Sequence, residues 1–175
     1  MKTRNLIFLI LTILWMGVIF SQSAKVADDS AAQSGRLLIH IGEHFITGFE
    51  NWPEEKKQEF VEKYDHPVRK GAHMTEYAVL CMLLVGTMYK AGKKDGQEHE
   101  NRRIFAIYWL ISTVYAATDE FHQTFVPGRS GEVKDVCFDS AGALIGVFLA
   151  IIIINVIKSM FKDKSERTYS SLRLK

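Results

Sequence analysis

The sequence predicts an all-α protein, a polytopic membrane helical bundle with four transmembrane helices and an outer amphipathic helical segment. Four apolar stretches are nearly free of charge, charged residues crowd between them, and the basic residues are unevenly shared among the connecting segments. The overall composition hides this segregation, because 47% hydrophobic and 24% charged residues is close to the average of soluble proteins. A length of 175 residues fits a single domain over 1–175.

The four predicted spans cover about 6–20, 71–89, 104–121 and 136–157. A membrane-spanning helix needs roughly 20 apolar residues, which the second and fourth stretches provide. The third stretch reaches that length only with its polar end included, and the first only with flanking residues. Because the first stretch is short, follows basic residues and precedes small ones, it also resembles a secretory signal peptide. Trp15 near its far end favours an interfacial anchor instead.

Lysine and arginine near the spans predict the orientation. Basic residues precede the first span, fill the link 90–103 between the second and third, and follow the fourth in the tail 158–175. The link between the third and fourth spans holds only Arg129 and Lys134. We therefore expect a multi-pass protein of the cell membrane with both termini cytoplasmic and with the long loop 21–70 on the outer side.

The outer loop is expected to begin with a polar, turn-like stretch over 21–34. Residues 36–49 place apolar side chains at helical spacing, which predicts an amphipathic helix lying in the membrane interface. A charged helix is expected over 53–64, because proline is favoured at the first helical position. Pro67 is expected to end that helix, since the residue before a proline disfavours helical geometry.

Two residue pairs could in principle form a metal site or a disulfide, but the sequence favours neither. His40 and His44 lie one helical turn apart and could bind a metal, but exposed interfacial histidines are the preferred interpretation. Cys81 is expected near mid-membrane and Cys137 near the outer face, too far apart for a disulfide. Both cysteines are interpreted as small apolar packing residues.

Ionisable side chains within the predicted spans are the candidate functional residues, because charge is costly in lipid. Helical phase and depth place them in one layer near the outer headgroup boundary. The candidate catalytic residues are His73, Glu76, Asp119, Glu120, His122 and Asp139. The candidate substrate-binding residues are Arg69, Lys70, Gln123, Arg129 and Asp135. On the same face as the aspartates of the fourth span, Gly142 and Gly146 form a pattern that permits close helix packing.

Several interpretations of this layer stay open. Histidines could act as general base and acid with carboxylates orienting them, and arginines could hold a phosphate or a carboxylate. The same histidines and carboxylates could instead ligate a divalent metal, although no cofactor or metal site is assigned. The layer could also be an ion-pair network that only fixes the bundle. A net charge of +2 and the absence of a basic–aromatic patch speak against nucleic acid as a partner.

Two stretches carry a family resemblance: VRKGAHMTEYAVL at 68–80 and DEFHQTFVPGRSGEVKDVCFDSAGALIG at 119–146. Together with an opening apolar stretch that ends in FSQS, they closely resemble the VanZ-like family. The resemblance covers most of the chain apart from the loop 24–65 and the basic tail. It implies a bacterial multi-pass membrane protein, in a family whose named member is associated with low-level teicoplanin resistance. The resemblance brings no settled biochemical reaction with it.

Three functions therefore follow as expectations. The first is a cell-envelope protein that lowers susceptibility to teicoplanin-like glycopeptides through an outer-leaflet polar pocket. Its partners would be the lipid bilayer and a lipid-linked cell-wall precursor or the glycopeptide itself. The second is an outer-leaflet enzyme acting on a lipid-linked or phosphorylated envelope substrate. The third is a non-catalytic membrane scaffold.

Overall fold

The computed structural model describes residues 3–88 and 97–173, with side chains over 3–87 and 101–160. Its elements are α1 (Thr3–Ser23), α2 (Ala27–Phe45), the 3-10 helix η1 (Phe49–Asn51), α3 (Glu54–Met88), α4 (Gln97–Gln123) and α5 (Val133–Arg173). No strand occurs in these described ranges, so the all-α prediction is confirmed. The basic link residues Lys90, Lys93 and Lys94 lie outside the described residues.

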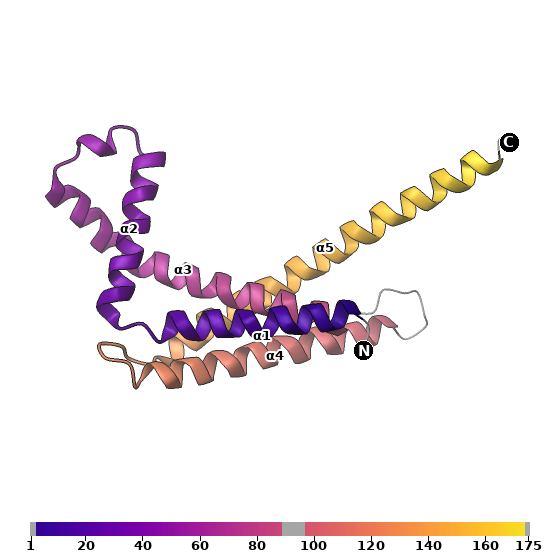
Figure 1. Ribbon diagram of the computed structural model, residues 1–175, viewed down its shortest axis with the longest axis horizontal. Helices are drawn as coiled ribbons and strands as arrows, with labels where there is room; N and C mark the ends of the chain where they lie inside the picture. Colours follow the sequence, from indigo (N-terminus) through magenta and orange to yellow (C-terminus); the bar gives the residue numbers. More distant parts are fainter. Residues whose placement is uncertain (1–2, 89–96, 174–175) are drawn as a thin grey trace.

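The second half of α3 is the centre of the bundle, because α1, α4 and α5 all pack against it. Figure 1 shows α1 and α4 running alongside each other, while α5 begins at one end of the bundle and leaves it at an angle toward the C-terminus. The buried core between these helices contains Ile19, Tyr77, Leu80, Cys81, Val85, Tyr108, Ala116, Ala143, Val147 and Ala150. Each of the four helices thus contributes to a single core.

The outward faces of the bundle are apolar. Ile13 and Leu14 on α1, Val114 on α4 and Phe148 on α5 are all exposed large hydrophobic side chains. Within the described residues, α1 and Val133–Met160 of α5 are the two helices long and apolar enough to cross a membrane. The second half of α3 and most of α4 carry polar side chains within their length, which lowers their mean hydropathy. That these two helices also cross stays a prediction.

Close approach of α3 and α5 confirms the glycine pattern predicted on the fourth span. A Cβ atom on Gly142 would lie 2.2 Å from the backbone oxygen of Met74, and one on Gly146 would lie 2.2 Å from that of Ala78. Backbone therefore meets backbone at these two positions, and no side chain fits between them.

The expected end of a helix at Pro67 is wrong, because Pro67 lies inside α3, which runs without a break over 35 residues. Proline at that position removes the hydrogen bond to the carbonyl of Lys63. Both Pro67 and Lys63 are exposed, so water can satisfy that carbonyl instead. The charged helix of the outer loop and the second predicted span are consequently one continuous rod.

The expected turn-like stretch over 21–34 is also wrong. Helix α1 extends to Ser23 and α2 begins at Ala27, so only a short connection remains. Helix α2 then packs against the first half of α3, forming a hairpin that stands off the bundle in Figure 1. Ser34 donates a hydrogen bond to the Asp65 carboxylate between the two helices.

The apolar face expected to lie in the membrane interface is largely covered by protein. Leu38 and Phe49 are buried, and the Phe49 ring contacts Gly42, Trp52 and Phe60. Phe45 is the exception, with 83% of its surface exposed. The hairpin therefore has a small core of its own. Helical periodicity alone predicted that these apolar side chains face the membrane.

The structure shows how the histidine pair lies and how far the two cysteines are exposed. The rings of His40 and His44 lie 4.2 Å apart, centroid to centroid. Cys81 is buried, Cys137 is exposed and both are free thiols, as expected.

Candidate functional site

Polar residues from four helices gather at one end of the bundle, which we call the polar end. It consists of the last turns of α1 and α4, residues 65–76 of α3, the loop 124–132 and the first two turns of α5. The continuity of α3 through Pro67 places its basic and acidic residues beside the α4–α5 loop. The layer predicted from helical phase is therefore assembled from elements distant in sequence.

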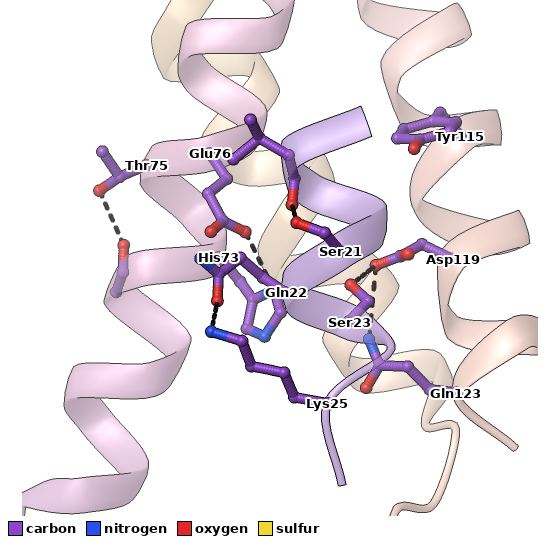
Figure 2. A network of polar contacts seen from close by, with 12 residues as sticks. Ser21, Gln22, Ser23, Lys25, His73, Thr75, Glu76, Tyr115, Asp119 and Gln123 are labelled. Atoms are coloured by element: carbon purple, nitrogen blue, oxygen red, sulfur yellow. Dashed lines mark hydrogen bonds and ion pairs between the residues drawn. The ribbon is translucent and has the colours of Figure 1, made fainter. Parts of the chain in front are cut away.

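A chain of hydrogen bonds crosses the polar end from α1 to the α4–α5 loop (Figure 2). The Ser23 hydroxyl donates to the Asp119 carboxylate at 2.6 Å, and the Gln123 amide donates to the same carboxylate oxygen at 3.4 Å. The Arg129 guanidinium in turn donates to the Gln123 side-chain oxygen at 2.9 Å. The position of Arg129 thus depends on a carboxylate that is only 3% exposed.

His73 and Glu76 face each other on one side of α3 (Figure 2). The distance from His73 Nδ1 to Glu76 Oε2 is 3.6 Å, longer than a hydrogen bond. The backbone of Glu76 is fixed separately, because the Trp15 indole N–H donates to its carbonyl at 2.9 Å. Trp15 therefore joins α1 to α3 and packs against the core, and its predicted position at the membrane interface stays a prediction.

Three contacts tie the start of α5 and the loop before it to neighbouring helices. The Lys70 ammonium lies 2.5 Å from the Asp135 carboxylate and 4.5 Å from the centroid of the Phe138 ring. The Glu120 carboxylate accepts a hydrogen bond from the backbone N–H of Glu132 at 3.0 Å. Glu120 thereby holds the loop that leads into α5.

Two adjacent cavities open at the polar end. The first is about 170 Å³ in volume and is lined by residues of α2, α3, α4, α5 and the loop, including Lys70, Glu120, Gln123 and Asp135. The second is about 270 Å³ and lies between α2 and α3, where Leu37, Val68 and Ala72 add an apolar wall beside Glu76. Both cavities share four lining residues, which are Ser30, Arg69, His73 and Arg129.

The structure brings most of the predicted residues together but not all of them into the cavities. Asp119 and Asp139, which is 2% exposed, are buried and line neither cavity. His122 also lines neither, because its ring packs against Phe20 with centroids 4.6 Å apart. The two aspartates are therefore buried within the polar end without lining these two cavities.

Several residues at this site were missed by sequence reasoning. Ser23 contacts Asp119, and Ser30 lines both cavities. The Lys25 ammonium donates to the side-chain oxygens of Gln22 and Gln33, each at 2.6 Å. Ser23 is the second serine of the FSQS stretch, which indicates a family resemblance but does not predict a contact with Asp119.

Unpaired polar atoms concentrate at the polar end. Buried side-chain atoms are usually hydrogen-bonded, so those without a partner call for an explanation. Among the described residues, the buried atoms without a partner include His73 Nδ1, Glu76 Oε2, Asp119 Oδ1 and His122 Nδ1. Such a group is suited to bind water or a ligand that completes its hydrogen bonds.

Arg69 and Arg129 are the cations shared by the two cavities, which carboxylates also line. Burial lowers the pKa of Arg129, and the nearby positive charge of Arg69 lowers it further. Arg69 donates toward Asp65, with 3.5 Å between its Nε and the carboxylate, while Arg129 donates to a neutral amide. A phosphate or carboxylate between the two guanidinium groups would relieve their repulsion and provide a planar, two-pronged contact. No cluster of three or more metal-ligating side chains occurs among the described residues.

The fold and site define a membrane-associated helical bundle with a polar site at one end. The VanZ/LLP1 family profile matches residues 8–155, and the chain belongs to that family. The match spans α1 to α4 and most of the apolar part of α5, so it includes every candidate site residue. No curated protein and no solved structure matches the chain.

Proposed function

We propose that four helical segments cross the membrane: α1, the second half of α3, α4 and the apolar part of α5. The exposed apolar faces of α1, α4 and α5 support this arrangement. The central position of α3 explains how it tolerates His73 and Glu76, because neighbouring helices shield polar groups from lipid. The contacts of Trp15 and Ser23 support retention of α1 in the working protein.

The polar end faces the outer side in this proposal, and both termini are cytoplasmic. The basic residues that flank the opposite end of the bundle support that orientation. A reporter active only in the cytoplasm should give signal when fused after Lys175 and none when inserted after Ser130. Signal at Ser130 would place the polar end in the cytoplasmic leaflet and contradict the proposed topology.

The function that the site supports best is binding of an anionic envelope component at the outer leaflet. The occupant would be a lipid-linked cell-wall precursor, or the glycopeptide itself, and binding would lower susceptibility to teicoplanin-like glycopeptides. One observation carries this proposal: Arg69, Arg129 and His73 border both cavities, beside buried polar atoms without partners. A network that served only to fix the helices would satisfy its own hydrogen bonds.

The proposal is tested by measuring teicoplanin susceptibility and membrane abundance in the same strains. Arg129→Gln and Glu76→Gln should raise susceptibility while abundance stays near that of the wild type. Glu62→Gln is the matched control, because Glu62 is an exposed carboxylate of the same helix α3 and lines neither cavity. Wild-type susceptibility in both cavity variants would contradict the proposal. A parallel fall of abundance and phenotype would support the scaffold function instead.

An enzymatic function is the second candidate, and the His73–Glu76 pair favours it. A histidine on the wall of a cavity, with a carboxylate 3.6 Å from its ring nitrogen, is a candidate general base. Its substrate would be a phosphorylated or lipid-linked envelope molecule held by Arg69 and Arg129. Purified protein should then release the headgroup of a lipid-linked wall precursor, and His73→Asn should stop release without stopping binding. Binding without release by the wild type would favour the non-catalytic function.

A further inference from the structure

Arg129 is held differently from the other arginine and lysine residues that line the cavities of the polar end. The Lys70 ammonium lies 2.5 Å from a carboxylate oxygen, and the Arg69 Nε lies 3.5 Å from another. Within the part of the chain that the structure describes, Arg129 forms no such ion pair, and its guanidinium donates to the side-chain oxygen of Gln123 at 2.9 Å. A neutral amide therefore stands where a carboxylate stands beside the other two cations.

The Gln123 amide can serve Arg129 in only one orientation. Its nitrogen donates to Asp119 Oδ2 at 3.4 Å, and Figure 2 shows this nitrogen facing the carboxylate. A carboxylate only accepts hydrogen bonds and a guanidinium only donates them, so the amide turns its nitrogen to Asp119 and its oxygen to Arg129. Ser23 donates to the same Asp119 oxygen at 2.6 Å. Because Gln123 and Asp119 are both buried, water does not compete for these contacts.

The residue type at position 123 has a physical reason. A glutamate in place of Gln123 would bring a second negative charge beside Asp119 and would pair directly with Arg129. A guanidinium already paired with a carboxylate has fewer N–H groups left for an anionic ligand. Burial and Arg69 together lower the pKa of Arg129, although carboxylates beyond ion-pair distance raise it. The amide thus fixes the guanidinium without cancelling its charge.

We propose that Gln123 is a positioning residue that holds Arg129 at the boundary of the two cavities, ready for the anionic group of a ligand, and that Asp119 acts by fixing the Gln123 amide. This inference rests on the proposed binding of an anionic envelope component. It gives Asp119, which lines neither cavity, a role in binding that needs no contact with the ligand.

The test is a double-mutant cycle on binding by the purified full chain in detergent. Calorimetry measures the affinity for farnesyl diphosphate relative to that for farnesol, so that partition of the apolar chain cancels. Arg129→Gln should lower this ratio roughly tenfold or more, because hydrogen bonds to charged groups are the strong ones. Gln123→Met keeps an unbranched side chain of similar length and should lower it roughly threefold or more. In the Arg129→Gln background, Gln123→Met should cause no further loss, because its effect acts through Arg129.

Two further variants separate positioning from stability. Asp119→Leu removes the acceptor that orients Gln123, so it should weaken binding only while Arg129 is present. Thr87→Val is the control, because it removes a buried hydrogen bond to Tyr108 near the far end of α3. It should lower the melting temperature without changing the affinity ratio, and a fall of that ratio in Thr87→Val would mean that binding only follows stability.

The outcomes distinguish this inference from the proposed function. An equal affinity ratio for the wild type and Arg129→Gln would contradict the proposed anion binding, and the positioning role with it. A ratio that depends on Arg129 but is unchanged in Gln123→Met would overturn the positioning role alone. So would a loss in Gln123→Met that persists at full size in the Arg129→Gln background, because that loss would not act through Arg129. Wild-type binding by Asp119→Leu would overturn the role of Asp119.

Discussion

The interface between α3 and α5 has two halves of opposite character. In the half next to the core, Gly142 and Gly146 bring α5 against the backbone of α3. In the half at the polar end, the same two helices are joined by the Lys70–Asp135 ion pair, and Asp139 lies buried nearby. One half is thus held by close packing without charge, and the other contains an ion pair and a buried carboxylate.

The difference favours close packing over charge as the interaction that brings these helices together. Helix association in membranes relies on small residues that permit close approach, and the glycine half supplies them. Polar groups at the other end add desolvation costs that a purely structural interface would avoid. The ligand proposed for the two cavities would account for their presence there.

Gly146→Leu should have the largest effect on stability, because it places a large side chain in the close-packed half of the α3–α5 interface. A side chain cannot be accommodated where a Cβ atom would lie 2.2 Å from the Ala78 carbonyl oxygen, so α5 must move away from α3. We expect a loss of about 3 kcal/mol or more in the free energy of unfolding, at the upper end of overpacking effects. Thermal unfolding in detergent measures it.

Gly17→Leu is the control for that substitution, since nothing lies within 4 Å of a Cβ atom at Gly17. It should leave the melting temperature unchanged or slightly raised, because leucine has a higher helix propensity than glycine. Equal melting of the two leucine variants would mean that the glycine half does not hold the bundle, and the comparison of the two halves would fail.

Ser23→Ala should have an intermediate effect, because it removes one hydrogen bond from the buried Asp119 carboxylate. Leaving a buried acceptor without its donor costs about 1–3 kcal/mol. Ser21→Ala is the matched control, since the exposed Ser21 hydroxyl bonds only to the Val18 carbonyl of its own helix. Unfolding in detergent should separate the two variants. If they melt alike, the Ser23–Asp119 contact contributes nothing to the polar end.

Much of the bundle was predictable because hydropathy and helical phase are local properties. The apolar stretches, the free cysteines and the glycine pattern on α5 all follow from residue type and spacing along one helix. Helical depth also placed His73, Glu76, Asp119 and Asp139 near the same end. None of these features depends on which helices are neighbours, so each can be predicted from one helix at a time.

The rest depends on contacts between distant segments. Pro67 was expected to end a helix, but exposure of the turn around it lets α3 continue. The apolar face of α2 was assigned to the membrane, because sequence does not show that α3 is long enough to cover Leu38 and Phe49. Which groups line a cavity is likewise a tertiary property, so the sequence does not show that Asp119 is buried and lines neither cavity.

Lys70→Gln should have the smallest effect on stability and tests the charged half directly. The side chains of Lys70 and Asp135 are 20% and 33% exposed, so water weakens their attraction even at 2.5 Å. Partly exposed ion pairs contribute on the order of 1 kcal/mol or less. A double-mutant cycle with Asp135→Asn, followed by thermal unfolding, isolates that contribution. If the coupling instead exceeds the loss in Gly146→Leu, charge rather than close packing holds α5 to α3. The ion pair itself would then explain why these two charges are partly buried, and the charged residues beside the cavity would give no reason to expect a ligand.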